Sequence, residues 1–190
     1  MKKTKLLAVV GLPGSGKTEV INYLKKKYHF PNVYLGQVTF DRLKEEGLEI
    51  NPQNEKMIRE NLRKEHGMAS HAILSLPKIE KLMGTTKVLL LESMYSWEEY
   101  LTFKKKYGED FFTLAINSGP KTREKRLKNR AVRPLKNSQE FLDRDYSQIE
   151  NLNQAGPIAR ADYTIVNEDS LAVLHENIEK TLEILNLKTL

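Results

Sequence analysis

Five short apolar runs divide the chain, and each is followed by a longer polar segment. The runs occupy residues 6–10, 33–35, 88–91, 111–116 and 163–166. Each run is almost continuously apolar and shows no alternation, which is typical of strands covered by helices on both faces. Strands that alternate with helices predict a parallel sheet. The pattern therefore predicts an α/β fold, a three-layer α/β/α sandwich with a five-stranded parallel sheet, formed by a single domain over residues 1–190.

Two of the predicted helices have clear local signals. Ser96 and Glu99 have the spacing of a capping box, which predicts a helix that starts there and ends near Tyr107. A final helix is predicted from an apolar stripe with steps of three and four residues, formed by Leu171, Leu174, Ile178, Leu182 and Leu185. We expect this whole stripe to pack on the sheet, because its spacing places it on one helix face.

Composition narrows the possible partners and excludes several kinds of chemistry. Lysine and arginine outnumber aspartate and glutamate 31 to 25, a formal charge of +6 that favours anionic partners such as phosphates or nucleic acid. The absence of cysteine excludes thiol chemistry and disulfides, and it suits a cytoplasmic protein. Mean hydropathy is −0.54, and no apolar run approaches the roughly 20 residues of a membrane helix, so no membrane association is expected.

The strongest chemical signal is a complete phosphate-loop motif directly after the first apolar run. The segment Gly11-Leu12-Pro13-Gly14-Ser15-Gly16-Lys17-Thr18 fits the pattern G-x-x-x-x-G-K-[ST]. Glycines let backbone N–H groups surround the phosphates, and the following helix start adds positive potential. Lys17 is expected to reach the β- and γ-phosphates, and the Thr18 hydroxyl to bind Mg²⁺. The nucleotide-binding residues are predicted to be Gly11, Pro13, Gly14, Ser15, Gly16, Lys17 and Thr18. An ordinary glycine turn is the alternative.

A carboxylate at the end of the third apolar run is a candidate second metal ligand. Glu92 directly follows Val88-Leu89-Leu90-Leu91. The carboxyl ends of strands in open α/β sheets face the ligand crevice. We therefore expect Glu92 to take a metal-binding or catalytic role, with a salt-bridged helix cap as the alternative.

Arginines gather in the segment at about 122–145, which is predicted to form a lid. Arg126 and Arg130 are four apart on one helix face, and Arg144 lies on the next helix, which Asn137 is expected to cap. Arg123 and Arg133 belong to the same segment. We expect these guanidinium groups to close over the phosphates and stabilise transition-state charge. The alternative is a solvated basic surface.

The segment at about 37–86 is larger than a strand crossover needs, and it is predicted to form a helical acceptor lobe. A helical stretch should begin at Pro52, break at Gly67 and be disturbed at Pro77. Three arginines in the lobe are candidates for binding an acceptor phosphate, namely Arg42, Arg59 and Arg63.

With these parts in this order, the chain resembles P-loop nucleotide kinases of the adenylate kinase and dephospho-coenzyme A kinase group. The lid and the last strand with its loop carry the likeness to dephospho-coenzyme A kinases, through Arg126-Leu127-Lys128-Asn129-Arg130, Arg144 and the segment from Ala161 to Leu171. This resemblance implies that Asn167 to Asp169 lie beside the adenine ring. The chain most resembles small archaeal adenylate kinase-related proteins of unassigned activity, through Gly36-Gln37-Val38, Leu62-Arg63-Lys64-Glu65-His66-Gly67 and Gly108-Glu109-Asp110-Phe111.

Two departures from these kinases leave the acceptor open. Dephospho-coenzyme A kinases use an aspartate just after strand two as the base toward the acceptor hydroxyl, whereas this chain has Tyr34-Leu35-Gly36-Gln37 there, and Asp41 follows one turn later. After strand three the chain has Glu92-Ser93, where many nucleotide kinases have Asp-Gly or Asp-Arg.

The predicted function is a Mg²⁺-dependent, ATP-binding phosphotransferase, a nucleotide kinase that moves the γ-phosphoryl of ATP to a nucleotide or nucleotide-like small molecule. The predicted catalytic residues are Lys17, Glu92, Arg126, Arg130 and Arg144, with Thr18 and Glu92 at the metal and Asn167 at the nucleotide. Two alternatives remain: an ATPase or nucleotide switch with a protein partner, and an RNA-associated nucleotide binder. ATP is preferred by default, because no guanine-reading tetrapeptide lies near the last strand.

Overall fold

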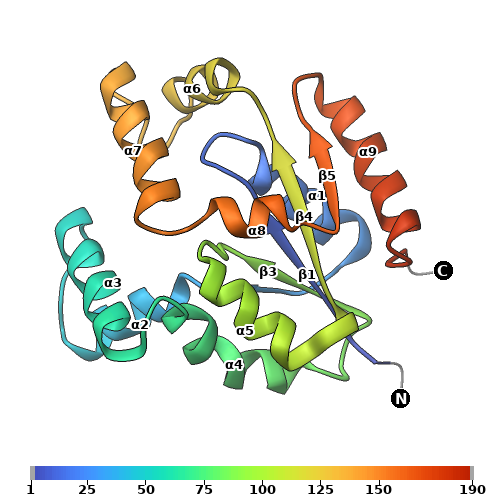
Figure 1. The fold of residues 1–190 in the computed structure, drawn as a ribbon, viewed down its shortest axis with the longest axis horizontal. Coiled ribbons are helices and arrows are strands. Elements are labelled where there is room, and N and C mark those ends of the chain that lie inside the picture. Colours follow the sequence, from blue (N-terminus) through green and yellow to red (C-terminus); the bar gives the residue numbers. More distant parts are fainter. Residues whose placement is uncertain (1–2, 189–190) are drawn as a thin grey trace.

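A computed structural model describes residues 3–188 as one twisted sheet flanked by helices (Figure 1). The strands are β1 (Lys5–Val10), β2 (Asn32–Tyr34), β3 (Val88–Glu92), β4 (Phe111–Asn117) and β5 (Tyr163–Val166). All neighbours pair in parallel, in the order β2-β3-β1-β4-β5. The predicted five-stranded parallel sheet and its α/β class are confirmed.

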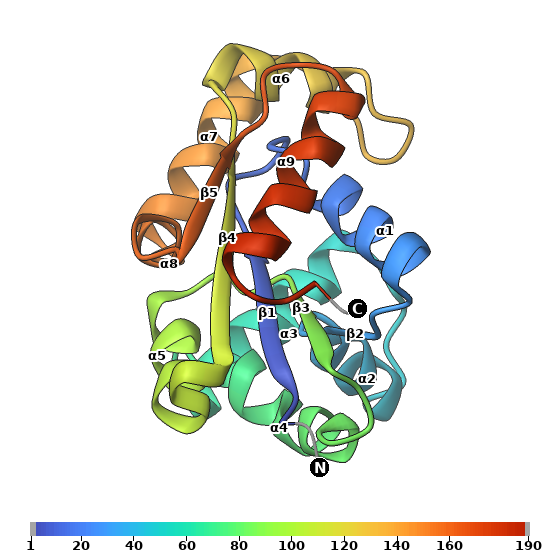
Figure 2. The ribbon, with the colours of Figure 1, turned by 90° about the vertical axis from the view of Figure 1, so that its right-hand side faces the viewer.

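The helices form a layer on each face of the sheet and two projecting units. They are α1 (Lys17–Tyr28), α2 (Gln37–Glu45), α3 (Pro52–His66), α4 (Ser70–Leu82), α5 (Trp97–Tyr107), α6 (Pro120–Lys128), α7 (Ser138–Glu150), α8 (Ala155–Ala159) and α9 (Leu171–Ile184), with the short 3-10 turn η1 (Gly108–Asp110). Figure 2 looks onto the face that α1 and α9 cover. Helices α4, α5 and α8 lie on the opposite face (Figure 1). None of the helices in the described part of the chain combines the length and apolar composition needed to cross a bilayer.

Strand β1 explains the two hydrophobic layers, because its successive side chains point to opposite faces. Leu7 and Val9 pack with residues of α1 and α9, whereas Leu6, Ala8 and Val10 pack with residues of α4 and α5. All five are buried. The continuous apolar character of the strand therefore follows from helices on both sides.

The capping box at the start of α5 is confirmed, whereas the stripe on α9 is only partly buried. Leu174, Ile178 and Leu182 pack in the core as predicted. Leu171 is 57% exposed, which corrects the prediction for this residue. It is the first residue of α9, one turn before Leu174, where the buried part of the helix begins. Leu187, beyond the helix end, is buried instead.

Helix α4 runs through Pro77, which does not end it. Proline removes the hydrogen bond to the carbonyl of Ile73, but Ile73 lies on an exposed side where water can take that place. Ala72 and Ile79, on the buried side, pack against the sheet. Helix α4 thus belongs to the sandwich, although we expected it in the acceptor lobe.

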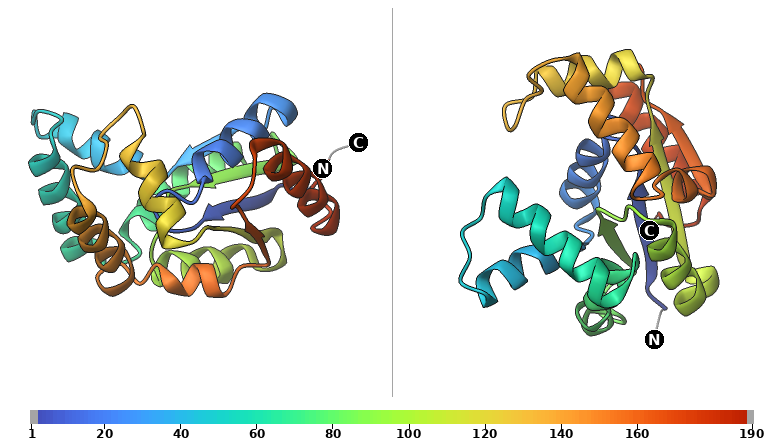
Figure 3. Two further views of the ribbon diagram at one scale, coloured as in Figure 1. Left: turned by 90° about the horizontal axis from the view of Figure 1, so that it is seen from above. Right: turned by 60° about the vertical axis from the view of Figure 1, so that its left-hand side comes forward.

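Helices α2 and α3 form a small unit with its own apolar cluster of Leu43, Ile58 and Leu62. The α6–α7 pair has another, formed by Leu127, Leu135 and Phe141. Figure 3 shows both pairs standing on the same side of the molecule, toward the end where β1 leads into the loop before α1. We call α2–α3 the lobe and α6–α7 the lid. The two units face each other beyond the carboxyl ends of the strands.

Candidate functional site

The loop between β1 and α1 has a backbone shape that requires glycine. Gly14 and Gly16 have φ angles of 82° and 106°, in the left-handed region that other residues rarely adopt. A Cβ atom on Gly14 would lie 2.7 Å from the carbonyl oxygen of Arg123. The loop therefore depends on both the backbone freedom and the missing side chain of glycine.

Two buried amide side chains donate hydrogen bonds to backbone carbonyls of this loop. Asn167, directly after β5, donates from Nδ2 to the Ser15 carbonyl at 2.8 Å. Gln154, directly before α8, donates from Nε2 to the Gly11 carbonyl at 3.0 Å. The prediction for Asn167 concerned the adenine, and the structure shows its side chain bracing the loop. Gln154 was missed, because α8 has only five residues and no sequence pattern announces it.

Lys17, the first residue of α1, points its ammonium group back at the loop. Nζ donates to the carbonyls of Gly11 at 2.6 Å and Leu12 at 3.1 Å. Burial, with a smaller contribution from nearby Arg123, lowers the pKa of Lys17 to about 8, and Glu92 opposes this shift. The ammonium group is desolvated, and its partners within residues 3–188 are two neutral carbonyls, as expected of a group that receives an anion.

A cavity of about 510 Å³ opens in front of the loop. Its lining includes five of the predicted catalytic and metal-binding residues, Lys17, Thr18, Glu92, Arg130 and Arg144. Pro13 and Gly14 line it as well. The structure thus brings together residues of the phosphate loop, the end of β3 and the lid, which are far apart in the sequence.

Glu92 ends β3 beside β1, where its Cα pairs in register with Val9. Asn32 donates from Nδ2 to Oε2 of Glu92 at 3.1 Å. The next residue, Ser93, has a φ angle of 66°, which turns the chain sharply after the strand. A serine in this conformation is uncommon and such positions cluster at functional sites.

Thr18 and Glu92 offer oxygen atoms to the same cavity, and oxygen is the ligand type that Mg²⁺ prefers. Residues 3–188 contain no group of three or more His, Asp or Glu side chains that would enclose a metal by itself. Mg²⁺ usually takes one or two protein oxygens together with substrate phosphates and water. The available donors therefore fit Mg²⁺ delivered with a nucleotide.

Two lid arginines, Arg130 and Arg144, line this cavity together. Burial, followed by the charge of Arg144, lowers the pKa of Arg130. Arg130 donates from Nε to the carbonyl of Arg133 at 2.6 Å, and Arg144 donates to Glu140 at 3.3 Å. Repulsion between the two guanidinium groups favours an anion between them.

Two other lid arginines lie elsewhere. Arg126 does not line the cavity, and it donates to Ser118 Oγ at 2.9 Å. Arg123 is only 3% exposed and binds Asp145 through both carboxylate oxygens, one of them at 2.7 Å. Our expectation that Arg123 covers the phosphates is wrong. A guanidinium group buried at the junction of α6 and α7 needs a full set of acceptors, and Asp145 and the Ser118 carbonyl provide them.

A second cavity, of about 700 Å³, adjoins the first between the lobe and α7. Tyr34, Ser93, Tyr95 and Gln148 line both cavities. The predicted acceptor arginines Arg59 and Arg63 line the second cavity, together with Lys56, Lys64, Glu55 and Glu60.

Two residues considered for the acceptor lie outside this second cavity. Arg42 pairs with Glu65 at 2.6 Å on the outside of the lobe, because the face of α2 that carries it points away from the cavity. Asp41 is exposed and accepts a bond from Gln37 at 2.9 Å. Neither side chain is in place to contact an acceptor.

Glu55 connects the lobe to the lid across the junction of the two cavities. Its carboxylate accepts from Arg133 at 2.8 Å and from Arg59 at 3.4 Å. The hydrogen bonds from Arg133, opposed by burial, lower the pKa of Glu55. Sequence reasoning missed Glu55, because an acidic residue in the first turn of a helix usually only complements the helix dipole.

Comparisons with known proteins agree with the observed fold. Residues 10–141 match the family model described as an AAA domain. A UPF0200 protein of Thermococcus sibiricus is similar over 185 residues, with 32% identity and 96% of both chains covered. Among solved structures, shikimate kinase from Aquifex aeolicus has a similar fold, with a TM-score of 0.56, 20% identity and coverage of 97% of this chain and 99% of that one. A gluconokinase from Sinorhizobium meliloti covers 100% of both chains, with a TM-score of 0.56 and 12% identity.

Proposed function

Because the chain belongs to the UPF0200 family, contains an AAA domain and has the fold of P-loop kinases, we propose that it is a Mg²⁺-dependent phosphotransferase. In this proposal it moves the γ-phosphoryl group of ATP to a nucleotide or nucleotide-like acceptor. The observation that carries the proposal is the pair of adjoining cavities. One combines the phosphate loop with Glu92, Arg130 and Arg144, and the other opens beside it with a basic lining.

The phosphate loop and the metal-binding residues at the first cavity have distinct roles in the proposal. Backbone N–H groups from Gly11 to Gly16 hold the phosphates, and Lys17 leaves its two carbonyls to bind the β- and γ-phosphates. Thr18 and Glu92 hold Mg²⁺, which supplies charge neutralisation at the phosphates. Chemistry of this kind depends mainly on positioning and electrostatics.

The lid residues bind the other parts of ATP and exclude water. Arg130 and Arg144 bind the transferring group and stabilise the charge that spreads over its oxygens. The segment from Asn167 to Asp169 is assigned to the adenine of ATP, and Arg126, which donates to Ser118 Oγ, is assigned to the phosphates as a third lid arginine. Closure of the lid over the lobe excludes water, which otherwise competes with the acceptor for the phosphoryl group.

Turnover assays test this proposal. The purified protein is incubated with Mg²⁺ and ATP, with and without a panel of nucleoside monophosphates and other small acceptors, and ADP is measured. We expect ADP to form at least about tenfold faster with one acceptor than without any, because the acceptor replaces water in a closed site. ADP formation that ignores every acceptor and releases inorganic phosphate at the same rate would favour the ATPase alternative.

A further inference from the structure

The basic lining of the second cavity contains a cation that has no partner. Glu55 pairs with both Arg59 and Arg133, and Glu60 lies 3.8 Å from Lys56. Arg63, in contrast, is half-buried and makes no ion pair and no side-chain hydrogen bond within residues 3–188. Because burying an unpaired charge is costly, the cavity is prepared for an anion at Arg63.

Glu99, the carboxylate with the largest effect on the pKa of Arg63, already accepts hydrogen bonds within the protein. Burial lowers the pKa of Arg63, and Glu99 opposes this shift. Glu99 is buried, and its Oε2 accepts from the backbone amides of Tyr95 at 2.7 Å and Ser96 at 3.0 Å. Its hydrogen bonds thus go to the start of α5, and the guanidinium group stays available to a ligand.

The side chains that line this cavity are poorly suited to remove a proton from a hydroxyl group, and Glu99, whose pKa burial raises to about 7, does not line it. Glu55 is held ionised by arginines, and hydrogen bonds from Arg133 lower its pKa. Glu60 is exposed at the rim. Glu92, on the side of the first cavity, is assigned to Mg²⁺.

The histidine of this cavity is also a poor base. Burial, with contributions from Arg63 and Arg59, lowers the pKa of His71 to about 4. Its Nε2 lies 3.0 Å from the Thr39 hydroxyl and its Nδ1 lies 3.2 Å from the Ser70 hydroxyl. Both ring nitrogens therefore have partners inside the protein.

A hydroxyl acceptor and a phosphate acceptor make different demands on such a site. A hydroxyl group must lose a proton as it attacks, and a carboxylate or histidine normally takes that proton. A monophosphate has a second pKa of about 6, so its oxygens carry no proton to remove at neutral pH. It requires cations that hold it near a second anion, and arginine suits this task through paired N–H donors.

We propose that the acceptor is an organic monophosphate, bound at Arg63, and that an oxygen of its phosphate is the nucleophile. This inference rests on the proposed function. A nonbridging oxygen of the acceptor phosphate forms a bond to the γ-phosphorus of ATP. The bond from that phosphorus to the β,γ-bridging oxygen breaks, and ADP leaves with the electron pair. The products are ADP and an organic diphosphate, and no proton is transferred.

The dimensions and remaining lining of the cavity suit a monophosphate that carries a flat ring. Its volume of about 700 Å³ lies within the range of small-molecule sites. Tyr34, Phe40 and Tyr95 supply aromatic surface. Nucleoside monophosphates are therefore the probes of choice.

The test compares matched acceptors that differ only in the phosphate. AMP, GMP, CMP and UMP are each assayed beside their own nucleoside with Mg²⁺ and ATP, and the products are identified by phosphorus NMR. We expect at least one monophosphate to exceed its nucleoside by about 100-fold or more in kcat/KM, and a phosphoanhydride to form, because the arginine contacts are lost with the phosphate. A nucleoside that is the better acceptor, or a phosphomonoester product, would overturn the inference.

Arg63→Met tests the assigned anchor, with Arg42→Met as the matched control from the outer face of the lobe. Arg63→Met should raise KM for the monophosphate about 10- to 100-fold, the range expected for hydrogen bonds to a charged group. The dissociation constant for Mg²⁺-ATP should stay unchanged in both variants, and Arg42→Met should leave KM unchanged. Thermal melting shows whether each variant folds, and an unchanged KM in folded Arg63→Met would contradict the assignment.

Calorimetric binding of Mg²⁺-ATP separates this inference from the proposed function. If ATP binds and a hydroxyl compound is phosphorylated, the protein is a kinase and only the phosphate-acceptor inference fails. If ATP binds and only inorganic phosphate is released with every acceptor, both fail.

Discussion

Helix α1 carries two lysines in opposite situations, Lys17 at its first residue and Lys27 near its end. Lys27 donates to Glu179 at 2.8 Å and to the Tyr23 hydroxyl at 3.0 Å, and the hydrogen bond to Glu179 raises its pKa. Lys17 contacts only two carbonyls, and burial lowers its pKa to about 8. The first lysine lacks an anion that the second one has.

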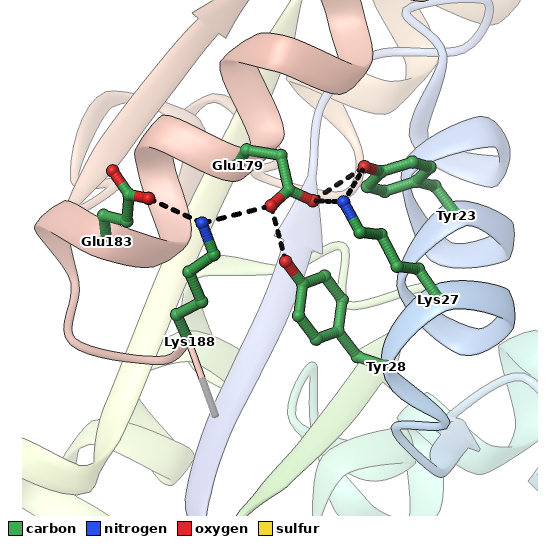
Figure 4. A network of polar contacts seen from close by, with 6 residues as sticks. All are labelled: Tyr23, Lys27, Tyr28, Glu179, Glu183 and Lys188. Carbon is green, nitrogen blue, oxygen red and sulfur yellow. Dashed lines mark hydrogen bonds and ion pairs between the residues drawn. The ribbon is translucent and has the colours of Figure 1, made fainter. Parts of the chain in front are cut away.

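Figure 4 shows how complete the network around Lys27 is. Glu179 of α9 accepts bonds from the hydroxyls of Tyr23 and Tyr28, both at 2.6 Å, in addition to its two lysine partners. This network fastens α1 to α9 and offers no free group to a ligand. A charged cluster whose members satisfy one another supports the fold, whereas cations buried without anions indicate a binding site.

Among the substitutions that distinguish the surroundings of Lys17 from those of Lys27, Lys17→Met is expected to have the largest effect. Removal of the ammonium group should lower the rate of phosphoryl transfer by about 10³-fold or more, because it contacts the transferring charge directly. Lys27→Met is the matched control on the same helix and should leave the rate unchanged. The measurement is kcat/KM for ATP, and near-normal turnover by folded Lys17→Met would contradict the site assignment.

Arg144→Met should have the next largest effect. We expect kcat to fall by roughly 10²- to 10³-fold, with a smaller change in the ATP dissociation constant, because the guanidinium group is assigned to transition-state charge. Arg42→Met again provides the control, because it removes a cation that lies outside both cavities. Equal losses in ATP affinity and in kcat/KM, with kcat unchanged, would assign Arg144 to ground-state binding instead.

The depressed pKa of Lys17 predicts a pH dependence of ATP binding. Polyphosphate binds the protonated amine and raises its pKa above the free value of about 8. Affinity is therefore fully present below pH 8 and falls as pH rises through and beyond this value, by up to about tenfold per pH unit. Calorimetry in buffers of different ionisation enthalpy should detect proton uptake on binding near pH 8.5. Binding without proton uptake there would show that Lys17 is already fully charged in the free protein.

The smallest effect is expected at the network around Glu179, between α1 and α9, and it concerns stability alone. Although burial opposes it, hydrogen bonds from Lys27, Tyr23 and Tyr28 lower the pKa of Glu179 to about 2. The stabilisation that ionised Glu179 provides is fully present above pH 4.5, the usual pKa of this carboxyl group, and is lost as pH falls toward 2. Glu179→Gln should cost about 1–2 kcal/mol at pH 7, or roughly 2–8 °C in Tm. The Tm difference from the wild type should shrink below pH 4, while turnover at pH 7 stays unchanged.

The fold was largely predictable because its signals are local. The strands appear as apolar runs, Ser96 and Glu99 form the capping box that their spacing indicates, and the phosphate loop lies between β1 and α1. Arg130 and Arg144 line the first cavity with Lys17. Such features depend on neighbours within a few residues or on the fixed edge of a parallel sheet.

Long-range partners could not be predicted. Arg123 is an arginine of the lid segment like the others, and only its contact with Asp145 shows that it is structural. Arg42 and Arg63 both belong to the lobe, but only the packing of α2 and α3 determines which one faces the cavity. Glu55 and Gln154 are ordinary helix-end residues in the sequence, and their roles arise from contacts with the lid and with the phosphate loop.

The central claim is that the loop from Gly11 to Thr18 binds a nucleoside triphosphate together with Mg²⁺. Isothermal titration of the purified protein with Mg²⁺-ATP at pH 7 tests it most directly. The account predicts one site per chain, with binding that is lost in Lys17→Met and kept in Lys27→Met. Heat changes indistinguishable from dilution for the wild-type protein, with ATP or with any other Mg²⁺-nucleoside triphosphate, would contradict it.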